Sequence, residues 1–253
     1  MKKKKIDIKL LLIFLAAIAV FVYAAVQLAI IFMGYYKGEQ EYAKLEKFAV
    51  SSSAGNSKGE LAEEFSVDFN ELEKINPEIV AWIHFENLDI NYPVVQAKDN
   101  EYYLTRTFNK EELKCGSIFM EAENKADLSD DNTFIYGHNM KDKSMFAKLN
   151  NYKEEEIYRE NPEFLIYTKS AIYRYSIFSC YQAEVNGDSF LYQFVNQEQY
   201  ADWLKMVTQQ SNYDTGIIPD AGKRTVTLMT CTSAGDNYRF LVHGTLTEII
   251  PVK

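Results

Sequence analysis

Residues 225–246 read TVTLMTCTSAGDNYRFLVHGTL and decide the fold of this 253-residue chain. Two runs rich in β-branched and apolar residues flank a polar turn, which predicts two neighbouring strands. The first run ends on Cys231, and Arg239 opens the second run eight residues later. A thiol at a strand end beside a guanidinium combines a nucleophile with a group that stabilises an oxyanion. Taken alone, Cys231 is more simply explained as a small buried residue, because most free cysteines are.

A cysteine nucleophile needs a proton acceptor, and the chain has three histidines. His138, in the sequence YGHN of residues 136–139, is the candidate, although the same pattern also suits a plain turn residue. His243 competes with it, because alternation along a strand puts His243 on the same face as Arg239. His84 is the third possibility.

The pattern of apolar and β-branched residues predicts a mainly β domain that covers residues 66–253. Strand-like runs occur at 80–85, 92–96, 117–121, 133–136, 164–168, 172–181, 225–230 and 238–247. Eight short strands with polar connections predict a closed barrel or a sandwich. An amphipathic helix is expected over 197–210, in a late connection between strands, and a short N-terminal helix is expected to begin near Asp68 and end before Pro77.

The first 65 residues indicate attachment to a membrane. Residues 1–9 form a basic head, and residues 10–33 carry no charge. At about 1.5 Å per residue, such a helix is long enough to cross a hydrocarbon core of about 30 Å. We expect an uncleaved signal anchor with the N-terminus in the cytoplasm and the domain outside the cell. A cleaved signal peptide is the alternative. Residues 34–65 are expected to form an extracellular linker, with a flexible Ser/Gly spacer at 51–59.

Charge and cysteine content narrow the possible functions. The net charge is −9, although the first 37 residues contain six lysines and one aspartate, so the remainder is strongly acidic. An acidic domain of this kind is not typical of a nucleic-acid binder. Three cysteines are too few for a disulfide scaffold, and an odd number leaves at least one thiol unpaired. Cys115 and Cys180 are interpreted as structural, and a bridge between them remains an alternative.

Several motifs together resemble the sortases, the cysteine transpeptidases of Gram-positive cell surfaces. TLMTC at 227–231, followed by an arginine at the start of the next strand, is similar to the sortase TLxTC signature. The other motifs are similar to those of class B sortases in their order and in their residues. These motifs are NP (76–77), VAWI (80–83), NYPVVQ (91–96), DNEYYL (99–104), GSIFM (116–120), YGHNM (136–140) and SMF (144–146). Met229 departs from the serine common at its position in class B.

This resemblance implies a sortase-type eight-stranded β-barrel with an N-terminal helix and a helix in a late connection. It implies that Cys231 is the nucleophile, His138 the proton carrier and Arg239 the oxyanion or substrate-orienting group. Asn100 and Leu104 match groove positions of class B sortases, and Tyr181 and Thr230 are further candidates for substrate binding. No cofactor is implied, and no carboxylate cluster in the sequence requires a metal.

The expected function is cleavage of a C-terminal sorting signal, of the NPxTx kind, after its threonine. A thioester on the cysteine then transfers the surface protein to an amine of the peptidoglycan precursor. One alternative is a pilin-polymerising sortase, in which a lysine of another protein is the acceptor. The others are a catalytically idle, membrane-tethered binding domain and a general extracellular cysteine protease.

Overall fold

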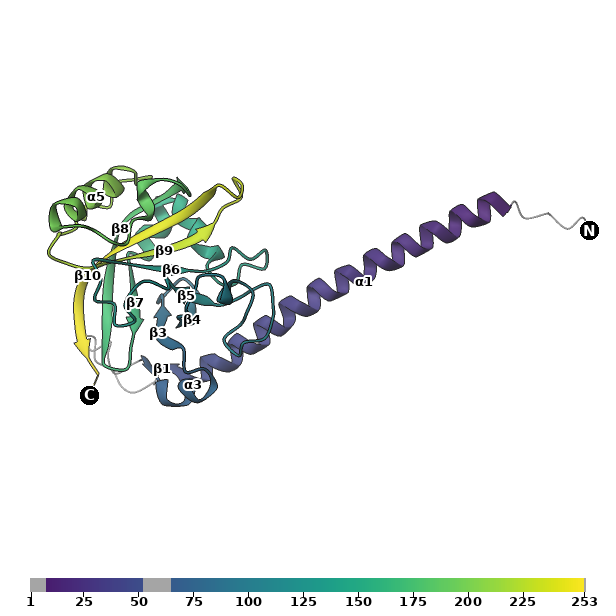
Figure 1. Cartoon of the computed structure of the whole chain (residues 1–253), viewed down its shortest axis with the longest axis horizontal. Helices are drawn as coiled ribbons and strands as arrows, with labels where there is room; N and C mark the ends of the chain where they lie inside the picture. The colour runs from purple at the N-terminus through teal and green to yellow at the C-terminus, as the bar shows by residue number, and fades with distance from the viewer. Residues whose placement is uncertain (1–7, 52–64, 253) are drawn as a thin grey trace, which may run out of the picture.

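A closed barrel of eight strands dominates the computed structural model, which describes residues 8–51 and 65–252. The order around the barrel is β10-β8-β7-β3-β4-β5-β6-β9 (Figure 1). The predicted β-barrel is confirmed, and each predicted strand differs from the observed one by a few residues at most. The strands are β3 (Ile79–His84), β4 (Asn91–Val95), β5 (Ile118–Met120), β6 (Asn132–Tyr136), β7 (Glu163–Tyr167), β8 (Ala171–Glu184), β9 (Thr225–Cys231) and β10 (Tyr238–Pro251).

Two of the eight strand pairings are parallel, namely β4 with β5 and β6 with β9. Parallel strands end at the same edge of a sheet. The residues that follow β6 therefore emerge beside the end of β9. The amide of Gly137 extends this pairing by one bond, because it donates to the Met229 carbonyl at 3.1 Å.

The hydrophobic core lies on both sides of the long strands β8 and β10. Inside the barrel, Ile135, Leu228 and Val242 are fully buried and lie opposite one another on β6, β9 and β10. On the outside, helix α5 (Gln197–Gln209) packs against the barrel wall. Its buried residues are the four expected from the amphipathic pattern, Tyr200, Trp203, Leu204 and Val207. The predicted late helix is therefore confirmed.

The predicted N-terminal helix of the domain is α3 (Phe69–Ile75). The Asp68 side chain caps it by accepting a hydrogen bond from the Glu71 amide at 3.1 Å. Asn76 ends the helix, and its side-chain amide donates to the Tyr103 hydroxyl at 2.8 Å and to the Phe108 carbonyl at 2.9 Å. The end of the helix is thus fixed to the chain that follows β4.

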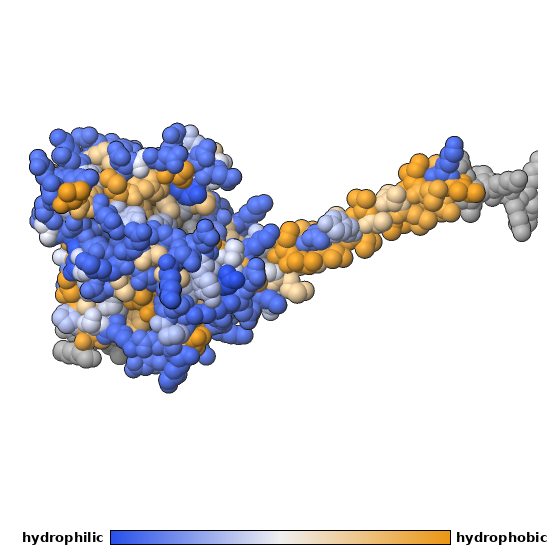
Figure 2. All heavy atoms as spheres, viewed as in Figure 1, coloured by the Kyte–Doolittle hydropathy of each residue, from blue (hydrophilic) through white to orange (hydrophobic). Residues whose placement is uncertain are grey.

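Helix α1 (Ile8–Leu45) projects far from the barrel (Figure 1). It is long and apolar enough to cross a membrane. The side chains of its outer part are exposed and hydrophobic, whereas the visible surface of the barrel is mostly hydrophilic (Figure 2). A continuous apolar surface of this size on an exposed helix is consistent with a single membrane span.

The C-terminal end of α1 packs against the barrel, although residues 34–65 were predicted to form a linker. Gly38, Glu41, Tyr42 and Leu45 are buried, at the i, i+3, i+4, i+7 spacing of one helix face. After the 3-10 turn η1 (Glu46–Phe48), strand β1 (Ala49–Ser51) pairs antiparallel with β2 (Phe65–Val67). The predicted Ser/Gly spacer at 51–59 therefore comes after β1 and before β2 in the sequence, and does not separate the helix from the barrel. Its residues 52–59 lie outside the described residues.

The other short elements lie between the barrel strands. They are the 3-10 turns η2 (Tyr102–Leu104), η3 (Ala147–Lys153) and η4 (Asp188–Phe190), and the helix α4 (Glu155–Glu160). Two of them, η2 and η3, supply residues to the site described below.

Candidate active site

Cys231 and Arg239 lie directly opposite each other on the antiparallel strands β9 and β10. Directly opposed residues on neighbouring strands point to the same face of the sheet, so the thiol and the guanidinium share one surface. Cys231 is exposed. Its carbonyl accepts a hydrogen bond from the Asn150 side chain of η3 at 3.1 Å. The Arg239 guanidinium donates to the carbonyls of Asp236 and Tyr238 at 2.7 and 2.9 Å, which steadies the β9–β10 turn.

His138 follows β6 and reaches the same edge of the barrel. Its Nε2 lies 2.6 Å from the Leu104 carbonyl oxygen. Because a carbonyl only accepts, Nε2 carries a proton in this contact. Gly137 brings the turn close to the barrel, since a Cβ there would lie 2.5 Å from Ile118 and 2.6 Å from Phe146. The amide of Phe146 donates to the His138 carbonyl at 3.0 Å and holds the turn from the other side.

Cys231, Arg239 and His138 line one surface cleft. Ten of the described residues form its wall: Asn100, Leu104, Phe119, Tyr136, Gly137, His138, Met229, Thr230, Cys231 and Arg239. Six of the seven residues predicted for the site are among them. The structure brings them together because β6 and β9 are parallel and because η2 ends against the His138 turn.

Tyr181 is the one predicted site residue that the structure places elsewhere. Its ring is buried beneath α5, among the hydrophobic residues that α5 packs against the barrel. Its hydroxyl donates to Ser189 at 3.0 Å, and its ring stacks on His243 at 5.4 Å. Tyr181 is opposite Leu241, so both point to the outer face of the barrel that α5 covers. The prediction that Tyr181 binds substrate in the cleft is corrected accordingly.

Glu121 supports two residues of the cleft wall, Asn100 and Tyr136, and the sequence analysis missed it. Its buried carboxylate accepts from the Asn100 side-chain amide at 2.6 Å and from the Tyr136 hydroxyl at 2.5 Å. The Asn100 oxygen accepts in turn from the Ala122 amide at 2.8 Å. Burial, together with the hydrogen bond and charge of Glu121, raises the pKa of Tyr136 far above its usual range. An acidic residue after a short strand carries no pattern that reveals this role.

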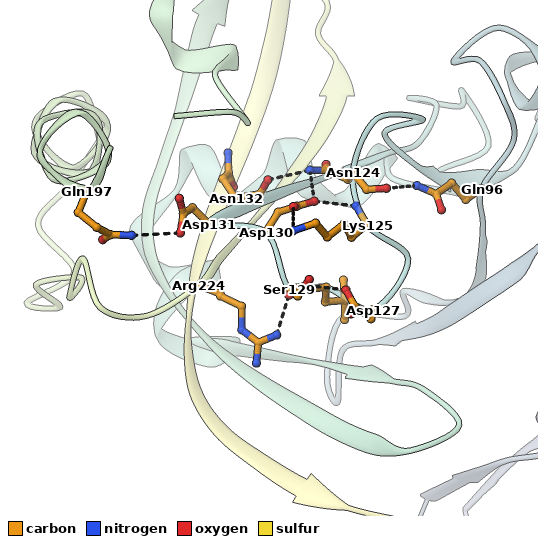
Figure 3. A network of polar contacts seen from close by, with 11 residues as sticks. Gln96, Asn124, Lys125, Asp127, Ser129, Asp130, Asp131, Asn132, Gln197 and Arg224 are labelled. Atoms are coloured by element: carbon orange, nitrogen blue, oxygen red, sulfur yellow. Dashed lines mark hydrogen bonds and ion pairs between the residues drawn. The ribbon is translucent and has the colours of Figure 1, made fainter. Parts of the chain in front are cut away.

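The loop between β5 and β6, which begins at Glu121, is held by a polar network (Figure 3). Its centre is Asn124, whose side chain donates to Asp130 at 3.0 Å and accepts from the Phe134 amide at 2.9 Å. Gln96 donates to the Asn124 and Glu121 carbonyls at 2.6 and 2.8 Å. These bonds fix the position of the Glu121 main chain and therefore of its carboxylate.

The other two cysteines are unsuited to nucleophilic attack. Cys115 and Cys180 are buried, and all three cysteines are free, so the alternative of a bridge between these two is not realised. Burial raises the pKa of the Cys115 thiol to about 11 and that of Cys180 to about 12. At neutral pH both therefore remain thiols, whereas the nucleophile is the thiolate.

The two rival histidines also lie outside the cleft wall. His243 is buried among aromatic rings, and Thr227 Oγ1 lies 2.9 Å from its Nδ1. Burial lowers the pKa of His243 to about 3, so its ring stays neutral near pH 7. His84 stacks on Phe65 at 4.2 Å, and burial lowers its pKa as well. Within the described residues, no group of three or more His, Cys, Asp or Glu side chains is arranged to hold a metal ion.

Comparison with known proteins bears directly on this arrangement. Residues 83–247 match the sortase domain. This chain belongs to the sortase family. It is 32% identical to sortase B of Listeria monocytogenes over 201 residues, which cover 79% of this chain and 80% of that protein. It is also 32% identical to sortase B of Staphylococcus aureus over 200 residues, which cover 79% and 81% of the two chains.

Solved structures of sortases give the same result. The crystal structure of Bacillus anthracis sortase B in complex with AAEK1 superposes with a TM-score of 0.74 and 33% identity, covering 86% of this chain and 100% of that one. The Staphylococcus aureus sortase B–substrate complex has a TM-score of 0.72 and 27% identity, covering 87% and 100%. The predicted class B assignment is therefore confirmed, and the chain is a cysteine transpeptidase by family.

Proposed function

We propose that this sortase cleaves a C-terminal sorting signal of the NPxTx kind after its threonine and transfers the surface protein to an amine of the peptidoglycan precursor. The observation that supports this most strongly is the register of β9 and β10, which puts Cys231 opposite Arg239. His138 follows the strand parallel to β9 and completes the set. The three side chains supply a nucleophile, an oxyanion stabiliser and a proton carrier.

In the first half-reaction, the Cys231 thiolate attacks the carbonyl carbon of the substrate threonine. The oxygen of that carbonyl becomes negatively charged, and Arg239 donates hydrogen bonds to it. The C–N bond then breaks, and the departing amine takes a proton from the His138 imidazolium. The product is a thioester on Cys231. Because Nε2 of His138 is bonded to Leu104, we assign the proton exchange to Nδ1.

In the second half-reaction, the acceptor amine attacks the thioester carbon. His138 takes a proton from the amine, and the sulfur leaves as the Cys231 thiolate. Both groups have then returned to their starting states, and a new amide joins the two substrates. Asn100, Leu104 and Thr230 line the same cleft as the thiol, and we propose that they contact the sorting signal.

The membrane helix suggests the location of this reaction. We propose that residues 1–9 stay in the cytoplasm, residues 10–33 span the membrane and the barrel lies outside the cell. The basic head supports this orientation, because lysines near a span remain on the cytoplasmic side. Protease added outside intact protoplasts is then expected to digest the barrel, and a barrel protected from this protease contradicts the orientation.

The test is a peptide assay with the full-length protein in detergent. An NPxTx peptide is incubated with and without a peptidoglycan-like amine, and products are separated by mass. Wild-type protein and Cys115→Ala are expected to form the amide product, whereas Cys231→Ala forms none. Hydrolysis that the amine does not divert indicates a protease, and a product formed only with a pilin lysine indicates a pilin polymerase. Turnover by Cys231→Ala contradicts the mechanism.

A further inference from the structure

The buried face of α1 lies against the loop that leads from η2 to β5. The Tyr42 hydroxyl donates to the Gly116 carbonyl at 2.7 Å and contacts Ser117 Oγ at 3.3 Å. The Glu41 carboxylate accepts from the Asn109 amide at 2.9 Å. Both side chains are more than 90% buried. The helix therefore holds this loop, which covers residues 105–117, at two separate points.

The loop is in turn packed against the backbone that binds the candidate catalytic histidine. Gly116 has a φ of +56°, and a Cβ there would lie 2.6 Å from the carbonyl oxygens of both Tyr103 and Leu104. The Ser117 amide also donates to the Tyr103 carbonyl at 3.0 Å. The Leu104 carbonyl is the atom that His138 Nε2 contacts at 2.6 Å. Gly116, which Tyr42 holds through its carbonyl, therefore lies in close contact with the backbone of Tyr103 and Leu104.

A second route leads from α1 to the other side of the His138 turn. The Tyr42 ring packs edge-on against the Tyr92 ring, with 5.4 Å between their centroids. The Tyr92 hydroxyl accepts a hydrogen bond from the Met145 amide at 3.1 Å. Met145 pairs with Asn139, which follows the histidine in sequence. One tyrosine of the helix thus supports both sides of His138.

We propose that Glu41 and Tyr42 are positioning residues for the transpeptidation reaction, through which the membrane helix keeps the Leu104 carbonyl and His138 in their reactive arrangement. The first buried residue of this face, Gly38, follows the proposed span by about 8 Å of helix. The helix is continuous between them, so the span and the reactive edge form one mechanical unit. The proposal rests on the proposed role of His138.

The test uses the full-length protein in nanodiscs and two measurements. The first is kcat and KM for cleavage of the sorting peptide. The second is the ring N–H signal of His138 in protein labelled with 15N-histidine, which is simple to assign because the chain has three histidines. Tyr42→Phe removes one hydroxyl and keeps the ring. Glu41→Ala removes the carboxylate, whereas Glu41→Gln keeps an oxygen that can accept from Asn109.

Tyr42→Phe and Glu41→Ala are each expected to lower kcat about fivefold, which is the factor that corresponds to one typical net hydrogen bond. KM changes less, because proton transfer by His138 is the step that suffers. The His138 ring signal is expected to shift in both variants, and Glu41→Gln is expected to restore most of kcat. The controls Tyr36→Phe and Glu39→Ala, at exposed positions of the same helix, are expected to match the wild type.

Two results overturn the proposal: an unchanged kcat in Tyr42→Phe and Glu41→Ala, or a reduced kcat with an unchanged His138 signal. A merely structural role lowers the melting temperature but leaves kcat and the ring signal of the folded protein as in the wild type. Failure of the proposed function is separate, because it appears as wild-type protein that does not turn over the peptide. The ring signal then still reports whether α1 positions His138.

Discussion

Replacing Glu121 by glutamine tests whether this buried carboxylate holds the wall of the cleft. Glu121 accepts two side-chain hydrogen bonds, one from Asn100 and one from Tyr136, and a longer one from the Glu123 amide at 3.4 Å. The Asn100 amide has no freedom to turn over, because its oxygen already accepts from the Ala122 amide. The glutamine oxygen must therefore face Asn100, and its NH₂ group faces the Tyr136 hydroxyl, which can rotate to accept. The variant keeps the geometry and loses the charge.

The expected magnitude follows from the two bonds. A hydrogen bond to a charged group contributes about 1.5–3 kcal/mol, and a neutral one about 0.5–1.5 kcal/mol. Two bonds that each lose about 1 kcal/mol lower the free energy of unfolding by about 2 kcal/mol. We expect kcat/KM to fall about tenfold, mainly through KM, because Asn100 and Tyr136 line the cleft but do not transfer the proton. Glu121→Ala is expected to cost more, since it leaves both donors without an acceptor.

The assay combines urea unfolding with steady-state kinetics on the sorting peptide. The matched control is Glu123→Gln, which removes an exposed carboxylate two residues away. Changes at exposed positions usually stay within about 0.5 kcal/mol. If Glu121→Gln and Glu123→Gln give the same unfolding free energy and the same KM, the anchoring role assigned to Glu121 is refuted.

Three further predictions concern the thiols, a buried histidine and the catalytic turn. Iodoacetamide is expected to modify Cys231 alone in the folded protein, because burial and raised pKa values protect the thiols of Cys115 and Cys180. Peptide mass spectrometry measures this, and modification of Cys115 or Cys180 as fast as that of Cys231 contradicts the prediction. The pKa of His243 is lowered to about 3 by folding, so the unfolded chain binds the extra proton and stability falls as pH drops below about 6.5. The free energy of unfolding is expected to fall by about 2 kcal/mol between pH 8 and pH 5 because of His243. Urea unfolding of the wild type and of His243→Phe at these two pH values isolates this contribution, and an equal pH dependence of the two proteins contradicts it. Gly137→Ala is expected to lower kcat at least tenfold while the barrel stays folded, because its Cβ collides with Ile118, and a wild-type kcat would show that the turn tolerates the shift.

Local patterns were sufficient to predict most of the secondary structure. The eight strands follow from runs of β-branched and apolar residues, and α5 follows from the spacing of Tyr200, Trp203, Leu204 and Val207. The Asp68 cap follows from the type of its side chain and its distance from Glu71. These signals are readable because each depends on residues a few positions apart. The linker prediction differed at residues 38–51, because helical and charged residues before a Ser/Gly stretch do not reveal that they dock on a barrel.

Six of the seven predicted site residues line the cleft, whereas Tyr181 does not. Period-two alternation says which residues share a face of a strand, but not which face is covered. In β8, both faces are buried, so only the position of α5 shows that Tyr181 packs outward. Glu121 escaped notice for a related reason, since its partner Asn100 lies 21 positions away along the chain.

The sequence by itself predicted the barrel, a helix long and apolar enough to span a membrane, and the thiol, histidine and arginine that line one cleft, because these predictions depend on composition, periodicity and short motifs. The tertiary structure alone decided how they meet. The parallel pairing of β6 and β9 brings His138 to the cleft that Cys231 also lines, although 93 positions separate them in the chain. The docking of Tyr42 on Gly116 joins the membrane helix to the same edge across 74 positions. Contacts over such distances arise from packing and hydrogen bonding in the folded state, and no local pattern encodes them.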